Sequence, residues 1–112
     1  MFLVTGGSGT TSGYTDSTEI YTESSGAWRI VGALPYVPGG YDLSIIAYDQ
    51  SVYIFGDRWF NPANGNFEDH DDILKFDATS ETWMRVGKMT EAKSFSTASI
   101  IDAEIMKHCI LF

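Results

Sequence analysis

The sequence predicts an all-β protein built from antiparallel strands. Three observations predict this class: an internal repeat of about fifty residues, short runs rich in β-branched and aromatic residues, and the lack of a sustained helical apolar period. The chain has 112 residues, of which 44% are hydrophobic, an ordinary fraction for a packed globular domain. We therefore expect one folded unit at most.

The clearest repeat relates two segments at an offset of 55 residues. Each segment has an aromatic residue, then a tryptophan, then a short run that contains a glycine. The matched positions are Tyr21 and Phe76, Trp28 and Trp83, Gly32 and Gly87, and Leu34 and Met89. Four matches in one register, including a tryptophan, indicate a duplicated structural unit.

A second match lies upstream, at an offset of 50 residues, where Phe2–Gly7 corresponds to Val52–Asp57. The two offsets differ because the loop that follows is longer in the second copy, Arg58–His70, than in the first, Ser8–Thr15. The same elements therefore recur with a longer loop between them.

A third copy begins near Ser94. There, Phe95–Asp102 is similar to Asp42–Asp49 at an offset of 53 residues, and the copy stops within Ile105–Phe112.

The repeated elements have the character of strands. Leu43–Tyr48 and Ser51–Phe55 are rich in β-branched and aromatic residues and are separated by a polar two-residue turn, Asp49-Gln50. Asp72–Phe76 and Thr82–Val86 form a second such pair, the latter alternating with a period of two. Four strands per copy, joined mostly by short turns, predict an antiparallel meander.

The order of residues in each copy resembles the kelch-repeat family: a hydrophobic strand ending in Gly-Gly, a variable loop, an acidic and an aromatic residue, six further residues and a tryptophan. The motif residues are Gly6, Gly7, Glu19, Tyr21 and Trp28 in the first copy and Gly56, Phe76, Asp77 and Trp83 in the second. In the second copy Asp57 stands where the family has its second glycine. Aspartate tolerates a left-handed backbone better than most residues do.

The resemblance implies about two four-stranded antiparallel blades of a kelch β-propeller, forming an incomplete ring. We expect a partial first blade in residues 1–40, a second blade in 41–92 and the truncated start of a third in 93–112. In this interpretation the chain is a fragment of a larger propeller whose remaining blades are missing from it. Exposed blade faces would then make the isolated chain poorly soluble or self-associating.

The resemblance also implies a role for the conserved aromatic positions of the motif. In kelch propellers these rings pack between neighbouring blades, which here assigns Tyr21, Trp28, Phe76 and Trp83 to packing in preference to ligand binding. A fully buried ring of this kind contributes roughly 150–250 Å² of apolar contact.

Charge and composition narrow the classes of partner. Fifteen acidic residues against seven basic ones give a net charge of −8, which argues against a nucleic acid or an anionic membrane surface as the partner. No signal peptide is visible near Met1, and one cysteine, Cys109, cannot form an internal disulfide. These features favour a reducing, cytoplasmic location.

The best binding candidates lie in the longer loop, Arg58–His70, because kelch propellers use the loops at their rims as working surfaces. Trp59, Phe60 and Phe67 stand there among Asn, Gly and Pro residues, and aromatic side chains are good interface anchors. The alternative is that these rings fold back over a blade edge as a cover. The shorter loop, Ser8–Thr15, is small and flexible by composition.

Metal binding and catalysis find little support. The acidic run Glu68–Asp72 lacks the glycine and the terminal glutamate of a calcium loop, so we expect a solvated turn and no metal site. His108 adjoins Cys109, but neighbours on an extended strand point to opposite faces, which separates a base from a nucleophile. We expect no catalytic residues, no enzyme activity and no cofactor.

The predicted function is a non-catalytic protein–protein interaction module. The resemblance implies roles such as the substrate adaptor of a ubiquitin ligase, which also requires BTB and BACK domains, or a cytoskeletal scaffold protein. An alternative is a piece of a kelch-type enzyme, similar to galactose oxidases or sialic-acid epimerases. A copper oxidase would need a Cys–Tyr crosslink, for which only Cys109 is present.

Overall fold

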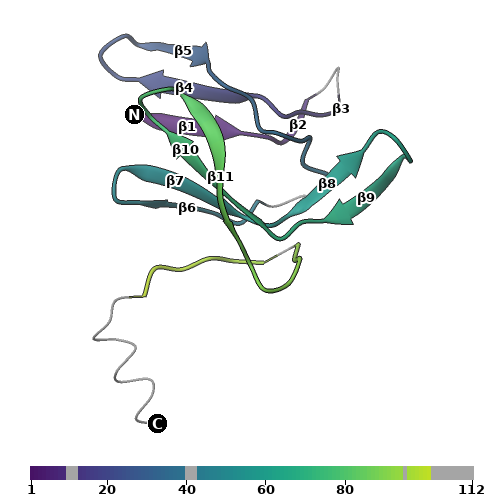
Figure 1. Cartoon of the computed structure of the whole chain (residues 1–112). Helices are drawn as coiled ribbons and strands as arrows, with labels where there is room; N and C mark the ends of the chain where they lie inside the picture. Colours follow the sequence, from purple (N-terminus) through teal and green to yellow (C-terminus); the bar gives the residue numbers. More distant parts are fainter. Residues whose placement is uncertain (10–12, 40–42, 95, 102–112) are drawn as a thin grey trace, which may run out of the picture.

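The computed structural model describes residues 1–9, 13–39, 43–94 and 96–101. All regular secondary structure within these ranges is β, and every strand pairs antiparallel with its neighbour, so the predicted all-β antiparallel class is confirmed. Two sheets face each other, and two small hairpins extend from them (Figure 1).

The first sheet has three strands in the order β1-β4-β5: β1 (Phe2–Thr5), β4 (Thr18–Thr22) and β5 (Ala27–Ile30). The second sheet has four strands in the order β11-β10-β7-β6: β6 (Ile45–Tyr48), β7 (Ser51–Phe55), β10 (Asp72–Asp77) and β11 (Thr82–Lys88). Consecutive strands of the second sheet are neighbours apart from the hairpin inserted between β7 and β10. The arrangement is therefore the meander that the strand pattern predicts.

The turn between β6 and β7 has the tight form expected of a two-residue hairpin. Asp49 and Gln50 have φ values of 49° and 61°, and two successive positive φ angles match the right-handed twist of the flanking strands. The register that follows pairs Ile46 with Tyr53 and Ala47 with Val52.

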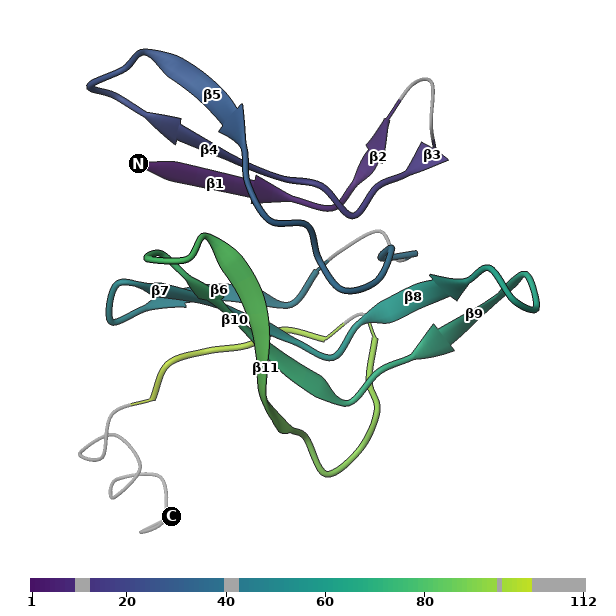
Figure 2. The ribbon, with the colours of Figure 1, turned by 45° about the horizontal axis from the view of Figure 1, so that its top comes forward.

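Both segments expected to be loops contain strands. The shorter holds a minimal hairpin, β2 (Ser8–Gly9) with β3 (Gly13–Tyr14), and the longer holds β8 (Arg58–Asn61) with β9 (Asn66–Asp69). Both hairpins extend from the same end of the sheets (Figures 1 and 2). The sequence predicted loops at both places and did not predict these strands, because the backbone groups here pair locally, without the long apolar alternation that marks a strand in sequence.

The core lies between the two sheets and in the connection from β5 to β6. Its buried centre consists of Leu34, Tyr36, Ile54 and Leu74, with Leu43, Trp59 and Trp83 packed against it. The sheets are also joined by polar contacts at one end, where Arg29 forms an ion pair with Glu81 and the Gly32 N–H donates to the Glu81 carbonyl at 2.9 Å.

The two aromatic pairs of the repeat have the same local geometry. Tyr21 lies directly opposite Trp28, and Phe76 lies directly opposite Trp83, with ring centroids 5.3 Å apart in both pairs. Their surroundings differ. Phe76 is buried and Trp83 reaches the first sheet, whereas Trp28 is 50% exposed on the face of the first sheet that points away from the second.

The turns after β1 and β7 also correspond. Gly6 and Gly7 have φ values of 68° and 95°, and Gly56 and Asp57 have 66° and 88°. Asp57 therefore adopts the left-handed backbone of the glycine that it replaces, a conformation in which Asp is over-represented among residues with a side chain.

Several sequence predictions fall outside the described residues. The expected boundary between the first two units lies at 40–41, and His108 and Cys109 lie in the last eleven residues of the chain. Residues 96–101, in the expected third copy, are described and belong to none of the strands.

Candidate binding site

The two hairpins touch through their aromatic side chains. Tyr14 of β3 makes an edge-to-face contact with Phe67 of β9, with ring centroids 5.9 Å apart and an interplanar angle of 87°. Since β3 and β9 are more than fifty residues apart in sequence, this contact joins the shorter loop of the first copy to the longer loop of the second. The two loops thus meet at this end of the molecule, where Figure 2 shows both hairpins.

The β8–β9 hairpin presents two different faces. Phe60 lies directly opposite Phe67, with ring centroids 5.4 Å apart, and Arg58 lies directly opposite Asp69. Residues that alternate along a strand share a face, so these four side chains are on the same side of the hairpin. We call Tyr14, Phe60 and Phe67 the aromatic patch.

The tip of the hairpin is held by a network of side chains. The Asn61 and Asn64 amides both donate to a Glu68 carboxylate oxygen at 3.2 Å. Gly65 has a φ of 72°, which favours glycine, and its N–H donates to the Asn61 carbonyl at 2.9 Å. These hydrogen bonds hold the tip in one conformation.

Trp59 points toward the core, away from the aromatic patch. Its ring is 6.0 Å from that of Tyr36 and 4.9 Å from that of His70, and it packs against the buried core cluster. The alternative considered for the loop aromatics, a ring folded back as a cover, describes the position of Trp59. Its role here is to anchor the base of the hairpin.

The segment before residue 40 fastens the hairpin to the sheets. The Phe60 N–H donates to the Val37 carbonyl at 2.9 Å, and the Gly39 N–H donates to the Arg58 carbonyl at 2.8 Å. A Cβ atom at Gly39 would overlap the ring of Phe67. The ring of Phe67 therefore lies directly on the Gly39 backbone, and it is still 42% exposed.

Sequence reasoning selected Trp59, Phe60 and Phe67, and the structure brings only the last two together on one surface. It missed Tyr14, which stood in a loop of small residues. The available signal was weak: Tyr14 is an aromatic residue directly after Gly13, in the loop that corresponds by repeat to the aromatic one.

The acidic residues that follow the patch form ion pairs with nearby basic side chains. Arg58 Nε is 3.2 Å from Asp69, Arg85 is 2.6 Å from Asp72, and Lys88 Nζ is 3.9 Å from Asp71. His70 Nδ1 is 3.5 Å from Asp72. Within the described ranges, no group of three or more His, Cys, Asp or Glu side chains is placed to hold a metal ion.

Behind the hairpin, Tyr36 is a buried phenol. Its hydroxyl donates to the Gly56 carbonyl at 3.2 Å, and its ring stacks on His70 with centroids 4.4 Å apart. Burial, with smaller contributions from the carboxylates of Asp57 and Asp72, raises the pKa of Tyr36 well above its ordinary value. The group therefore stays neutral and serves the structure at neutral pH.

No protein-family model matches the sequence, and no curated protein matches it significantly. In the part of the chain that the structure describes, no helix has the length and apolar character to cross a membrane.

Proposed function

We propose that this chain is a non-catalytic protein-binding module of the kelch-repeat type, which presents the aromatic patch to a partner protein. The observation that carries the proposal is the contact between Tyr14 and Phe67, which turns two separate loops into one surface. Aromatic side chains concentrate binding energy at interfaces because they bury a large area with few rotatable bonds.

The proposed surface is ordered before a partner arrives. Backbone hydrogen bonds from Phe60 and Gly39, together with the Asn61–Glu68 contact at the tip, hold the hairpin in place. A pre-formed loop loses less conformational entropy on binding than a mobile one. Beside the rings, Arg58 forms an ion pair with Asp69, and we expect a partner that offers an apolar pocket rather than a charged one.

The kelch assignment is supported by the sequence motif and by the two corresponding Gly turns, at Gly6-Gly7 and Gly56-Asp57. A substrate adaptor of a ubiquitin ligase or a cytoskeletal scaffold protein would use its rim surface in this way. The adaptor role would add a cullin as a second partner of the parent protein.

The test compares baits that differ only in the patch. Proteins captured by the wild-type chain are quantified beside those captured by Phe67→Ala and by Tyr48→Ala, since Tyr48 is 56% exposed and lies on β6, outside the hairpins. We expect a partner whose recovery falls about tenfold or more with Phe67→Ala and is unchanged with Tyr48→Ala. The candidate is then measured with both purified proteins.

Recovery that is equal for all three baits would contradict the proposal. Catalytic turnover by the purified chain on any substrate would contradict its non-catalytic part, independently of the binding result.

A further inference from the structure

In the residues that the structure describes, β1 forms an open edge of the first sheet. In the second sheet β7 lies between β10 and β6, whereas in the first sheet β1 pairs with β4 alone among the described residues. The repeat matches β1 to β7, since Phe2 is opposite Tyr21 as Val52 is opposite Phe76. Within the described part of the chain, the first sheet therefore has no strand that corresponds to β6.

The backbone of β1 is suited to take such a strand. The Phe55 N–H donates to the Ser44 carbonyl at 3.0 Å, on the β6 side of β7, and Thr5 corresponds to Phe55. On the other side, the Gly6 N–H donates to the Ser17 carbonyl at 3.0 Å. Because N–H groups alternate in direction along a strand, the N–H groups of Thr5 and Leu3 point to the open edge.

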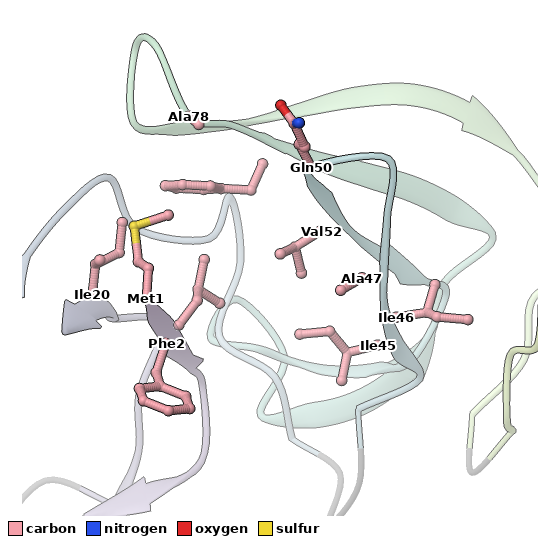
Figure 3. Close-up of a pocket in the computed structure, with 11 residues that line it drawn as sticks. Met1, Phe2, Ile20, Ile45, Ile46, Ala47, Gln50, Val52 and Ala78 are labelled. Carbon is pink, nitrogen blue, oxygen red and sulfur yellow. The ribbon is translucent and has the colours of Figure 1, made fainter. Parts of the chain in front are cut away.

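An apolar groove of about 360 Å³ runs beside this edge, between the two sheets (Figure 3). Met1, Leu3 and Ile20 line it from the first sheet, and Ile46 and Ala47 line it from β6. A strand added to β1 would place every second side chain over this groove.

A second groove, of about 350 Å³, is equivalent to the first and lies between the second sheet and residues 99–101. Tyr53, which corresponds to Leu3, lines it together with Ser99 and Ile100, which correspond to Ile46 and Ala47. Residues 96–101 therefore lie beside the second sheet in the same way that β6 lies beside the first sheet. They occupy the position of the first strand of another sheet.

Residues 96–101 cannot pair with β1 of their own chain in this arrangement. In both views the second sheet lies between β1 and this yellow-green segment (Figures 1 and 2). Ile100 and Ile101 are 53% and 54% exposed. Among the described residues, the first sheet thus has no strand paired to the outer edge of β1. At the opposite side of the molecule, residues 96–101 have the position of such a strand but pair with no sheet.

We propose that residues 96–101 of a second copy of this chain add a strand to the open edge of β1. The register of β6 on β7 carries over directly: Ile100 lies opposite Phe2, and Ser99 lies opposite Leu3. Ile101, which corresponds to Tyr48, lies opposite Met1 and points into the groove. The mixed sheet then has four strands, as the second sheet does.

The same step covers the exposed face of the first sheet. Phe2, Val4, Trp28 and Ile30 are each at least half exposed on it. Once the strand is added, this face packs against the partner's second sheet, on the side of that sheet that is turned away from the partner's own first sheet. Within one chain, Phe76 and Trp83 make the equivalent contact with the first sheet. The contact is head-to-tail, so copies assemble into rings or open chains.

The first test is the size of the full chain in solution. Light scattering over a range of concentrations is expected to show assembly that salt strengthens, because each copy carries a charge of −8. Ile101→Asp, which places a carboxylate in the groove, is expected to raise the dissociation constant more than about tenfold. Ala63→Asp is the matched control, since Ala63 is exposed in the turn between β8 and β9, outside the two large sheets.

The second test fixes the register. In a Cys109→Ser background, Phe2→Cys and Ile100→Cys chains are mixed and oxidised, and we expect a disulfide-linked dimer because directly opposite residues are close enough to bridge. Ala63→Cys replaces Ile100→Cys in the control and is expected to give none. Circular dichroism verifies that each variant keeps its sheets.

Two outcomes would overturn the proposal. If the chain stays monomeric at every concentration, a second copy does not bind the β1 edge, and a strand of a different protein becomes the candidate for it. An assembly that neither responds to Ile101→Asp nor forms the Phe2–Ile100 crosslink uses another surface.

Discussion

Trp83 donates its indole N–H to the Thr18 hydroxyl at 2.8 Å, across the boundary between the two sheets. Thr18 is fully buried, and its hydroxyl also lies 2.7 Å from that of Thr5. This chain of three polar groups adds to the polar contacts that Glu81 makes between the two sheets. A buried polar network of this kind selects one relative position of two sheets, because any other position leaves a donor or acceptor without a partner.

Replacing Thr18 by Val is expected to lower the free energy of unfolding by about 1–3 kcal/mol, because the indole N–H of Trp83 loses its acceptor in a buried setting. Urea denaturation measures the change. Thr79→Val, in an exposed turn, is the control and is expected to change stability by less than about 0.5 kcal/mol. Equal effects of the two substitutions would show that the hydrogen bond between the sheets contributes nothing.

How far the sequence predicts this fold depends on the range of the interactions. The repeat predicted that Tyr21 corresponds to Phe76 and Trp28 to Trp83, because a strand period and a duplicated pattern are visible locally, and the structure places both pairs in equivalent strands. The contact between Tyr14 and Phe67 was not predictable, since it joins loops of different copies and depends on how the two sheets are placed.

The candidate site shows the same limit. Sequence reasoning could select aromatic residues in a loop rich in Asn and Gly, but it could not tell that Trp59 turns inward and Phe67 outward. That difference arises because the 37–39 segment pairs with β8 and so determines which face of the hairpin meets the core. Non-local pairing of short strands leaves little trace in the sequence.

Gly56 and Gly7 provide a comparison between two left-handed glycines. A Cβ atom at Gly56 would lie 2.7 Å from the His70 and Lys93 carbonyl oxygens, whereas one at Gly7 would meet nothing within 4 Å. We expect Gly7→Ala to cost about 1–2 kcal/mol of stability for its backbone conformation alone. Gly56→Ala adds steric overlap with fixed backbone and is expected to cost more than about 3 kcal/mol, or to prevent folding.

Thermal unfolding of the two variants beside the wild type measures this difference. If both lose the same stability, the close approach of the Gly56 backbone to its neighbours is not a constraint on the fold.

Tyr36 predicts a loss of stability at high pH. The pKa of Tyr36 is raised in the folded chain by burial and by the nearby carboxylates, while in the unfolded chain it stays near 10.0. The contribution of Tyr36 to the free energy of unfolding is therefore complete below about pH 10. It decreases as the pH rises further, because the Tyr36 hydroxyl loses its proton more readily in the unfolded chain than in the folded one. Urea midpoints measured between about pH 8 and pH 11 test this dependence.

Tyr36→Phe should remove this part of the pH dependence and lower stability at about pH 8 by about 1 kcal/mol, through loss of the hydrogen bond to the Gly56 carbonyl. Tyr48→Phe is the control, because Tyr48 is 56% exposed. A Tyr36→Phe profile that runs parallel to the wild type would remove Tyr36 as the source of the alkaline loss.

Gly39 and Phe67 link the stability of the fold to the proposed binding surface. Because the Phe67 ring occupies the space of a Cβ at Gly39, Gly39→Ala must displace the ring or the 37–39 segment, and we expect a cost of about 1–3 kcal/mol. In a Phe67→Ala background the overlap with the ring is gone, and only the Phe60 backbone nitrogen stays close to this Cβ, at 3.3 Å. The same substitution should then cost clearly less, since alanine also restricts the unfolded chain more than glycine does. The double-mutant cycle therefore predicts a coupling energy of about 1 kcal/mol or more between the two positions, measured by urea denaturation. Additive effects would mean that Phe67 does not rest on Gly39 in solution. The aromatic patch would then lose the support that makes it a pre-formed surface.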